Sequence, residues 1–117
     1  VHNRRLTIFG NTLENYRYGI YIEFVDFTSI VANRIFNAAS FNAPATQGIY
    51  LFGCDSALVI GANVIRKTEG TNNTGIDILN CKGGLTGPCG QNAGNIYNNQ
   101  ILVGGTGTSV YECQPEP

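Results

Sequence analysis

The 117-residue chain is poor in charge, has no long apolar run and contains no methionine, and each absence narrows the possible classes of protein. Charged residues make up 13% of the chain and the formal net charge is −1, so the sequence has neither a basic patch for nucleic acid nor an acidic tail. Its apolar runs fall far short of the ~20 residues that a membrane-spanning helix needs, and no signal-peptide pattern stands at the start. The absence of methionine, even at position 1, predicts a processed product, an excised fragment or a domain of a longer protein.

Sustained helical periodicity is also absent, and the composition favours strands and turns instead. Glycine occurs 15 times, asparagine is abundant, and β-branched and aromatic residues recur in short bursts. The length suits a single domain, which we take to cover residues 1–117. The four cysteines are compatible with an oxidising compartment, although a chain of this length does not depend on disulfides to fold.

A glycine opens each of four similar segments, which identifies a repeat. The segments are Gly-Ile-Tyr-Ile at 19–22, Gly-Ile-Tyr-Leu at 48–51, Gly-Ile-Asp-Ile at 75–78 and Gly-Thr-Ser-Val at 107–110. Apolar residues alternate with others inside each segment, as expected of a strand with one buried face. Six positions after the glycine stand Val25, Cys54, Cys81 and Cys113, so three of the four cysteines share one position of the repeat.

An asparagine follows a second alternating segment in every repeat. These residues are Asn11, Asn33, Asn63 and Asn99, each with an isoleucine three residues before it and a leucine or isoleucine two residues after it. Because each asparagine separates two short strands, we expect a tight bend there, with the asparagine itself in the left-handed region. Stacked in register, the side chains can also hydrogen-bond to one another.

The spacing of the glycine and asparagine series defines a minimal coil of about 22 residues with three short strands, and the remaining length is loop. Residues 36–46 and 66–73 are expected to leave adjacent coils at the same corner, and residues 82–90 at a different corner. A β-sandwich of about seven or eight strands would also explain strands and turns, but not the alignment of the glycines and cysteines. We therefore expect an all-β solenoid of about four coils.

The repeats at 19–35 and 48–65, together with the asparagine series, resemble the right-handed parallel β-helix family of pectate lyases, polygalacturonases, alginate epimerases and phage tailspikes. The resemblance covers nearly the whole chain. It implies a single-stranded right-handed solenoid, a polysaccharide partner and a secreted or extracellular location, and the general handedness of parallel crossovers agrees. The polygalacturonase signatures Asn-Thr-Asp, Asp-Asp and Gly-His-Gly are absent, which argues against a hydrolase of that family.

Three functions stay open on this evidence. One is a carbohydrate-interacting module without catalysis of its own, in an extracellular or phage-type protein. Another is a polysaccharide lyase, hydrolase or epimerase. A third is a structural, self-assembling solenoid, because a coil cannot bury its own ends and no capping helix is visible; the open ends predict a homo-oligomer or a longer parent chain that covers them.

Tyr21, Tyr50 and Asp77 occupy one outward-facing position in successive coils and are the predicted substrate-binding residues. In the family, substrate usually lies along an outer strand face beside the loops of one corner. Aromatic faces suit the apolar faces of pyranoses, and the hydroxyl groups add polar contacts. The alternative interpretation is that outward-facing tyrosines on a sheet are ordinary cross-strand pairs.

Lyases of this fold use arginine or lysine as a base and Ca²⁺ to neutralise uronate carboxylates. The resemblance therefore makes Arg66 and Lys67, in the loop after Asn63, candidate catalytic residues together with Asp77. The alternative is that the basic pair forms a solvated corner. Ca²⁺ is expected only if the protein is a lyase, and no other cofactor is expected.

Asp26 and Asp55 share the position after the cysteine line in adjacent coils. Carboxylates stacked about one strand spacing apart, ~4.8 Å, can share a proton or bind a cation, and paired carboxylates also serve glycosidases. The alternative is that each aspartate caps a turn where a strand ends.

Cys81 and Cys89 bracket a short segment rich in glycine, and they form the disulfide that we favour. Closing this loop would stabilise the fold by roughly 2–3 kcal/mol through the entropy of the unfolded chain. Two alternatives stay open: a disulfide between Cys54 and Cys81 of neighbouring coils, and a buried stack of reduced cysteines. Zinc is not expected, because the sequence has no CxxC motif or histidine partner.

Overall fold

The computed structural model describes residues 3–37, 46–54, 59–67, 72–81, 96–104 and 107–115, and these residues form twelve strands and no helix. The strands are β1 (Asn3–Phe9), β2 (Thr12–Glu14), β3 (Tyr18–Glu23), β4 (Val25–Val31), β5 (Arg34–Phe36), β6 (Gln47–Phe52), β7 (Val59–Gly61), β8 (Val64–Lys67), β9 (Thr74–Cys81), β10 (Ile96–Tyr97), β11 (Gln100–Val103) and β12 (Ser109–Pro115).

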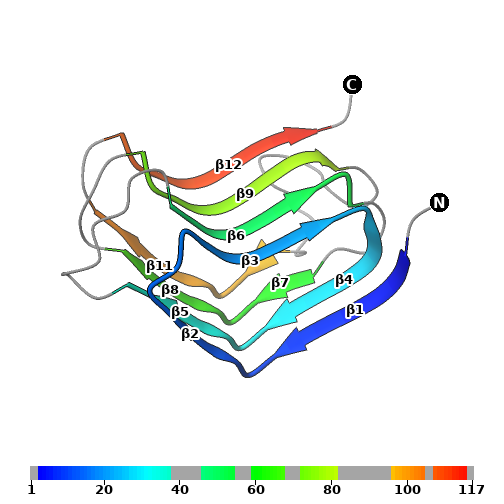
Figure 1. Ribbon diagram of the computed structural model, residues 1–117, viewed down its shortest axis with the longest axis horizontal. Coiled ribbons are helices and arrows are strands. Elements are labelled where there is room, and N and C mark those ends of the chain that lie inside the picture. The colour runs from blue at the N-terminus through cyan, green and yellow to red at the C-terminus, as the bar shows by residue number, and fades with distance from the viewer. Residues whose placement is uncertain are drawn as a thin grey trace.

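The chain visits three parallel sheets in turn (Figure 1). Sheet A has the order β1-β4-β7-β10, sheet B the order β11-β8-β5-β2, and sheet C the order β12-β9-β6-β3. Each of the first nine strands pairs in parallel with the strand three places further along the chain. The prediction of an all-β chain with parallel strands is confirmed, and the arrangement is consistent with a solenoid of about four coils.

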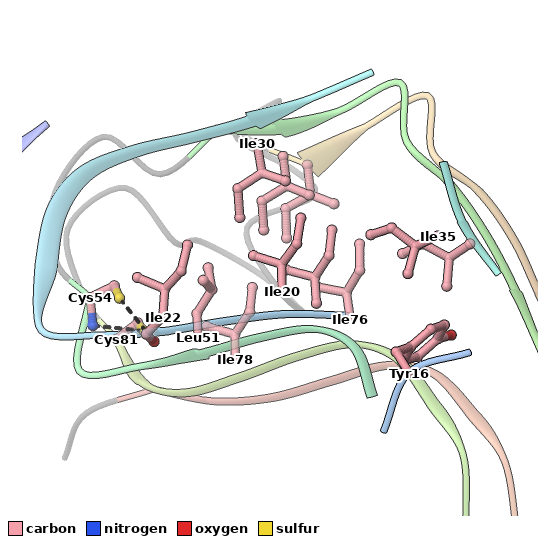
Figure 2. Packing of buried hydrophobic residues seen from close by; sticks show 14 residues of the cluster. Tyr16, Ile20, Ile22, Ile30, Ile35, Leu51, Cys54, Ile76, Ile78 and Cys81 are labelled. Carbon is pink, nitrogen blue, oxygen red and sulfur yellow. Dashed lines mark hydrogen bonds between the residues drawn. The ribbon is translucent and has the colours of Figure 1, made fainter. Parts of the chain in front are cut away.

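Inward-facing isoleucines fill the space enclosed by the three sheets (Figure 2). Three lines of the stack repeat isoleucine, and a further line in sheet C consists of Ile22, Leu51 and Ile78. Sheet A contributes Ile30, Ile60 and Ile96, sheet B contributes Ile35 and Ile65, and sheet C contributes Ile20, Ile49 and Ile76. Burial of one such side chain stabilises the fold by about 1.5–3 kcal/mol, and β-branched residues suit the closely spaced strands. The alternation in the sequence therefore identified the core.

The asparagine series forms a continuous hydrogen-bonded ladder at the corner between sheets A and B. Asn63 Oδ1 accepts from the backbone N–H of Asn33 at 2.9 Å and from Asn33 Nδ2 at 3.0 Å. Asn99 Oδ1 accepts in the same way from Asn63, and Asn33 Oδ1 from Asn11. The predicted stacking of the asparagines is confirmed.

The prediction that each ladder asparagine adopts the left-handed conformation is wrong. The residue with positive φ is the one directly before each asparagine. Gly10, Ala32, Ala62 and Asn98 have φ values of 71°, 59°, 54° and 51°. The ladder asparagines are selected instead for their amide groups, which satisfy the backbone N–H groups that the bend leaves without a strand partner.

The first three glycines of the predicted series lie side by side in neighbouring strands. Close packing explains why each position is a glycine. A Cβ atom on Gly19 would lie 2.5 Å from the carbonyl oxygen of Gly48, and one on Gly48 would lie 2.7 Å from that of Gly75. Side chains from sheet B press on the same points, with Ile35 Cγ2 at 2.6 Å from a Cβ on Gly19. Only hydrogen fits where sheets B and C meet.

The predicted register of the last coil is wrong by three residues. In β12, Tyr111 pairs with Ile76 and Cys113 with Ile78, so Gly107 and Cys113 do not continue the glycine and cysteine lines. Gly107 lies before the strand with φ 70°. The shift puts the large side chain of Tyr111, rather than a threonine, against the core cluster, and this covers more apolar surface.

The predicted corners are confirmed, but the loops predicted at 36–46 and 66–73 begin later than expected, and residues 82–90 lie outside the described residues. The β5–β6 and β8–β9 connections both lead from sheet B to sheet C, whereas the β9–β10 connection leads from sheet C to sheet A. Phe36 still belongs to β5, and Arg66 and Lys67 belong to β8. Their side chains are therefore positioned by a strand and not by a loop.

Candidate functional site

The outer face of sheet C carries a group of aromatic residues whose backbone positions follow from the repeat. Tyr21 of β3, Tyr50 of β6 and Asp77 of β9 lie on one rung, as the sequence predicted. They alternate with the inward-facing isoleucines, so their side chains leave the opposite side of the sheet. With Tyr18 and Gln47 they form what we call the tyrosine face.

Three tyrosine rings of this face touch one another. The rings of Tyr21 and Tyr50 are stacked, with centroids 4.7 Å apart and an interplanar angle of 19°. The ring of Tyr18 meets both edge-on, at 5.3 Å from Tyr21 and 5.9 Å from Tyr50. Tyr18 is 45% exposed and Tyr21 48% exposed, so the group is rigid and open to solvent at once.

An acidic side chain fixes the outermost ring. The hydroxyl of Tyr21 donates a hydrogen bond to Glu23 Oε1. This bond is the main cause that raises the pKa of Tyr21 to about 12, and burial is the main cause that raises the pKa of Tyr50. Both phenols therefore stay neutral at physiological pH and can offer their oxygens to a ligand.

Asp77, the third predicted member, is covered rather than open. Only 4% of the residue is exposed, and its Oδ2 accepts a 2.7 Å hydrogen bond from Gln47 Nε2. Burial raises the pKa of Asp77, the charge of Glu112 on the same rung raises it further, and the bond from Gln47 lowers it. Asp77 Oδ1 and Gln47 Oε1 are buried without a hydrogen-bond partner, and both are acceptors. Protonation of the Asp77 carboxyl group would supply the O–H donor that these two acceptors lack.

Replacing Asp77 by asparagine is expected to stabilise the protein by about 1–3 kcal/mol at neutral pH, because the new amide supplies a donor and carries no charge. The sign of the pH dependence follows from the raised pKa of Asp77. Its contribution to stability is complete below the ordinary pKa of 3.8 and is lost as pH rises through the raised value. Urea unfolding of the two proteins across pH should therefore show a difference that shrinks in acid.

The matched control for this prediction is Glu112→Gln, which removes the neighbouring charge and leaves Asp77 in place. Glu112→Gln should lower the pKa of Asp77. At neutral pH, its free energy of unfolding should therefore lie closer to that of the Asp77→Asn variant than the wild-type value does. A gap between wild type and Asp77→Asn that stays constant across pH would show that the carboxyl group is not protonated on folding.

The structure does not bring the three catalytic candidates together. Arg66 leaves the outer face of sheet B, whereas Asp77 lies on sheet C. Lys67 is 1% exposed and lies on the inward-facing side of β8, where the strand alternates between exposed and buried residues. The placement of Arg66 and Lys67 in a loop beside the substrate face is therefore wrong, because β8 extends through both residues.

The aspartate pair is only half described. Asp26 belongs to β4 and pairs in register with Arg4 of β1, and Asp55 lies outside the described residues. In the described ranges, no group of three or more histidine, cysteine or acidic side chains could hold a metal ion. The cation site at these residues stays a prediction.

The two cysteines that share the repeat position, Cys54 and Cys81, lie one coil apart and are both fully buried (Figure 2). Cys54 is a free thiol, and its backbone N–H donates to Cys81 Sγ at 3.1 Å. The side-chain hydrogen bond with Cys81 is the main cause that lowers the pKa of Cys54 to about 7. This contact is a hydrogen bond and not the alternative disulfide. Cys89 lies outside the described residues, so the disulfide favoured for Cys81 stays a prediction.

Sequence reasoning missed several members of the tyrosine face. Tyr18 directly precedes the repeat glycine, and Gln47 directly precedes the next one, so the position before the glycine was the available signal. The face also extends to Phe24 and Phe52, whose rings meet edge-on at 5.6 Å. Phe24 follows β3 and lies over Gly53, where a Cβ atom would be 2.6 Å from its ring.

Comparisons of the chain with protein-family models, with curated proteins and with solved structures returned no match. Within the described ranges, no helix has the length and apolar character to cross a membrane. The class that the fold defines is thus an all-β protein of three parallel sheets with an aromatic outer face.

Proposed function

We propose that this protein is a carbohydrate-binding solenoid module without catalysis of its own, from an extracellular or phage-type protein. The proposal includes a right-handed coil and kinship with the parallel β-helix proteins that act on polysaccharides. The observation that carries it is the stacked and exposed tyrosine group on sheet C.

The geometry suits the flat face of a sugar ring. Tyr50 is half-buried and stacks on Tyr21, and Tyr21 remains nearly half exposed, so part of this aromatic surface is open to a pyranose. Aromatic groups of this kind add about 0.5–1.5 kcal/mol beyond the area they bury when they stack on a partner. The rings are already ordered by their mutual contacts, so less side-chain entropy is lost on binding.

Polar groups beside the rings match the hydroxyl groups of a sugar. Glu23 accepts hydrogen bonds next to Tyr21, and the phenol oxygen of Tyr50 can donate and accept. A sugar bound here would meet an apolar surface and a polar rim, the combination found in small-molecule sites.

Binding is favoured over catalysis by where the candidate residues lie. Asp77 is covered, and Arg66 belongs to a different sheet. One observation supports the second candidate function, a lyase, hydrolase or epimerase. The pKa of Asp77 is raised, and proton donors in active sites often show such a shift. New reducing ends or unsaturated uronate absorbance produced by the wild-type protein would favour this second function.

Unpaired strand edges at both ends of the described stack support the proposal of a protein partner. Strands β1, β2 and β3 at one end and β10, β11 and β12 at the other each pair with one neighbour within the described residues. Unpaired strand edges are templates for further pairing. A homo-oligomer or a longer parent chain covering these edges is therefore part of the proposal.

A glycan array with neutral and uronate polysaccharides tests the binding function. A hit should lose affinity about tenfold or more in Tyr21→Ala and Tyr50→Ala, since a stacking contact of about 1.4 kcal/mol corresponds to one factor of ten. Tyr50→Phe should retain most binding if the ring, rather than the hydroxyl, makes the contact. Tyr97→Ala, which removes an exposed tyrosine from sheet A, is the matched control and should bind as wild type.

An array without hits would refute the carbohydrate-binding proposal. A hit that both alanine variants retain would place the sugar elsewhere on the molecule.

A further inference from the structure

Sheet B is a different sheet from sheet C, which carries the tyrosine face (Figure 1). A hollow of about 200 Å³ is lined by Arg34, Phe36, Val64 and Arg66, from β5 and β8. A second hollow of about 390 Å³ adjoins it through Val64 and Arg66 and continues to Leu102 of β11. We call the two together the arginine groove.

The strand register arranges the four residues of the smaller hollow as a checkerboard. Arg34 pairs with Val64, and Phe36 pairs with Arg66. The two arginines are therefore diagonal neighbours, with Cα atoms about 8 Å apart for strands spaced about 4.8 Å with a rise of about 3.3 Å per residue. Long side chains reach across such a diagonal, so two guanidinium groups can meet one ligand above an apolar floor.

Neither guanidinium group is engaged by the described part of the chain. Among the described residues, the side chains of Arg34 and Arg66 make no hydrogen bond or ion pair. Among the described strands of sheet B, the acidic residue is Glu14 of β2, which pairs in register with Phe36. Two positively charged side chains therefore line the groove, and Glu14 is the carboxylate beside them among the described strands of sheet B.

We propose that the arginine groove binds a phosphate monoester with an apolar or aromatic body. The two oxygens of a carboxylate lie in one plane and match one arginine fork, whereas the terminal oxygens of a tetrahedral phosphate point in different directions and can accept from two forks on different sides. A phosphate monoester carries a charge of about −1.5 to −2 at pH 7, which matches two guanidinium groups better than a singly charged sulfate ester does. Phe36, Val64 and Leu102 supply contacts for the organic part of the ligand.

Titration of the whole protein with phenyl phosphate, followed by the methyl NMR signals of Val64 and Leu102, tests this assignment. Phenyl phosphate should bind more tightly than inorganic phosphate, because the floor is apolar, and more tightly than phenyl sulfate or benzoate, because of charge and geometry. Arg34→Gln and Arg66→Gln should each weaken binding about tenfold or more, as expected for loss of a charged hydrogen bond. Arg17→Gln, which removes an arginine that lines neither hollow, should bind as wild type.

Three results would overturn the assignment. They are an absence of shifts with phenyl phosphate, affinity that is unchanged in both glutamine variants, and equal or tighter binding of phenyl sulfate or benzoate. The readout is independent of glycan binding, so failure of the tyrosine face and failure of the arginine groove are separate outcomes.

Discussion

Asn63→Ala is expected to lower the free energy of unfolding by about 3–5 kcal/mol, a large part of the 5–15 kcal/mol that stabilises a typical domain. The asparagine is fully buried in the middle of the ladder. Its Oδ1 accepts from the backbone and side chain of Asn33, and its Nδ2 donates to Asn99 Oδ1 at 3.0 Å and to the carbonyl oxygen of Ile30 at 3.0 Å. Alanine leaves these groups buried and unpaired, and each costs about 1–3 kcal/mol.

Asn11→Ala is the matched control for Asn63→Ala. Asn11 is exposed at the end of the ladder, and its backbone N–H still donates to Asn33 Oδ1 after the side chain is removed. We expect a loss below about 1 kcal/mol, because the two side-chain hydrogen bonds that are lost, to Asn33 Oδ1 and to the carbonyl oxygen of Phe9, are at most partly buried. Urea unfolding followed by far-UV circular dichroism measures both variants. Losses of similar size at both positions would contradict the view that burial within the ladder sets the cost.

Gly48→Ala is expected to cost about 3 kcal/mol or more, although it adds a single methyl group. The new Cβ would lie 2.6 Å from Ile65 Cγ2 and 2.7 Å from the carbonyl oxygen of Gly75. Overpacking a tight core costs about 1–3 kcal/mol when side chains can move, and here one obstacle is backbone held in a sheet. Thermal unfolding of the variant should show a strongly lowered midpoint.

A double variant separates the two contacts. Ile65→Ala removes the side-chain obstacle, so Gly48→Ala in that background meets only the backbone of Gly75. In the Ile65→Ala background, Gly48→Ala should still lower the free energy of unfolding, but by less than it does in the wild-type background. Gly10→Ala is the control for simple loss of glycine, since a Cβ there has no atom within 4 Å and only the φ of 71° is strained. It should cost about 1–2 kcal/mol, and a loss at Gly48 no larger than this would contradict the packing explanation.

Much of the fold followed from local patterns in the sequence. The isoleucines three residues before each ladder asparagine all fall on one line of the core, because alternation assigns a side chain to a face without reference to distant residues. The repeated asparagine likewise identified a stacked corner. The same reasoning failed at Gly107, where a glycine at a similar spacing serves the turn before β12 instead of the close contact between sheets.

The candidate site was predictable in its positions and not in its environment. Tyr21, Tyr50 and Asp77 share a rung as expected, but nothing in the pattern shows that the aspartate is buried under a hydrogen bond from Gln47, which is 30 residues away in the chain. Arg66 was assigned to a loop because the spacing between repeats overstated the loop length. The strand continues through it, and its side chain emerges on sheet B.

The sequence by itself determined the recurring strand segments, the inward-facing isoleucines and the asparagine corner, since these are properties of short segments that recur. Only the tertiary structure decided the register of the last coil, the covering of Asp77 and the meeting of Arg34 and Arg66 on one groove. Each of these depends on which residue of one coil lies over which residue of the next. That alignment is set by packing between segments more than twenty residues apart, so composition and spacing within one segment do not contain it.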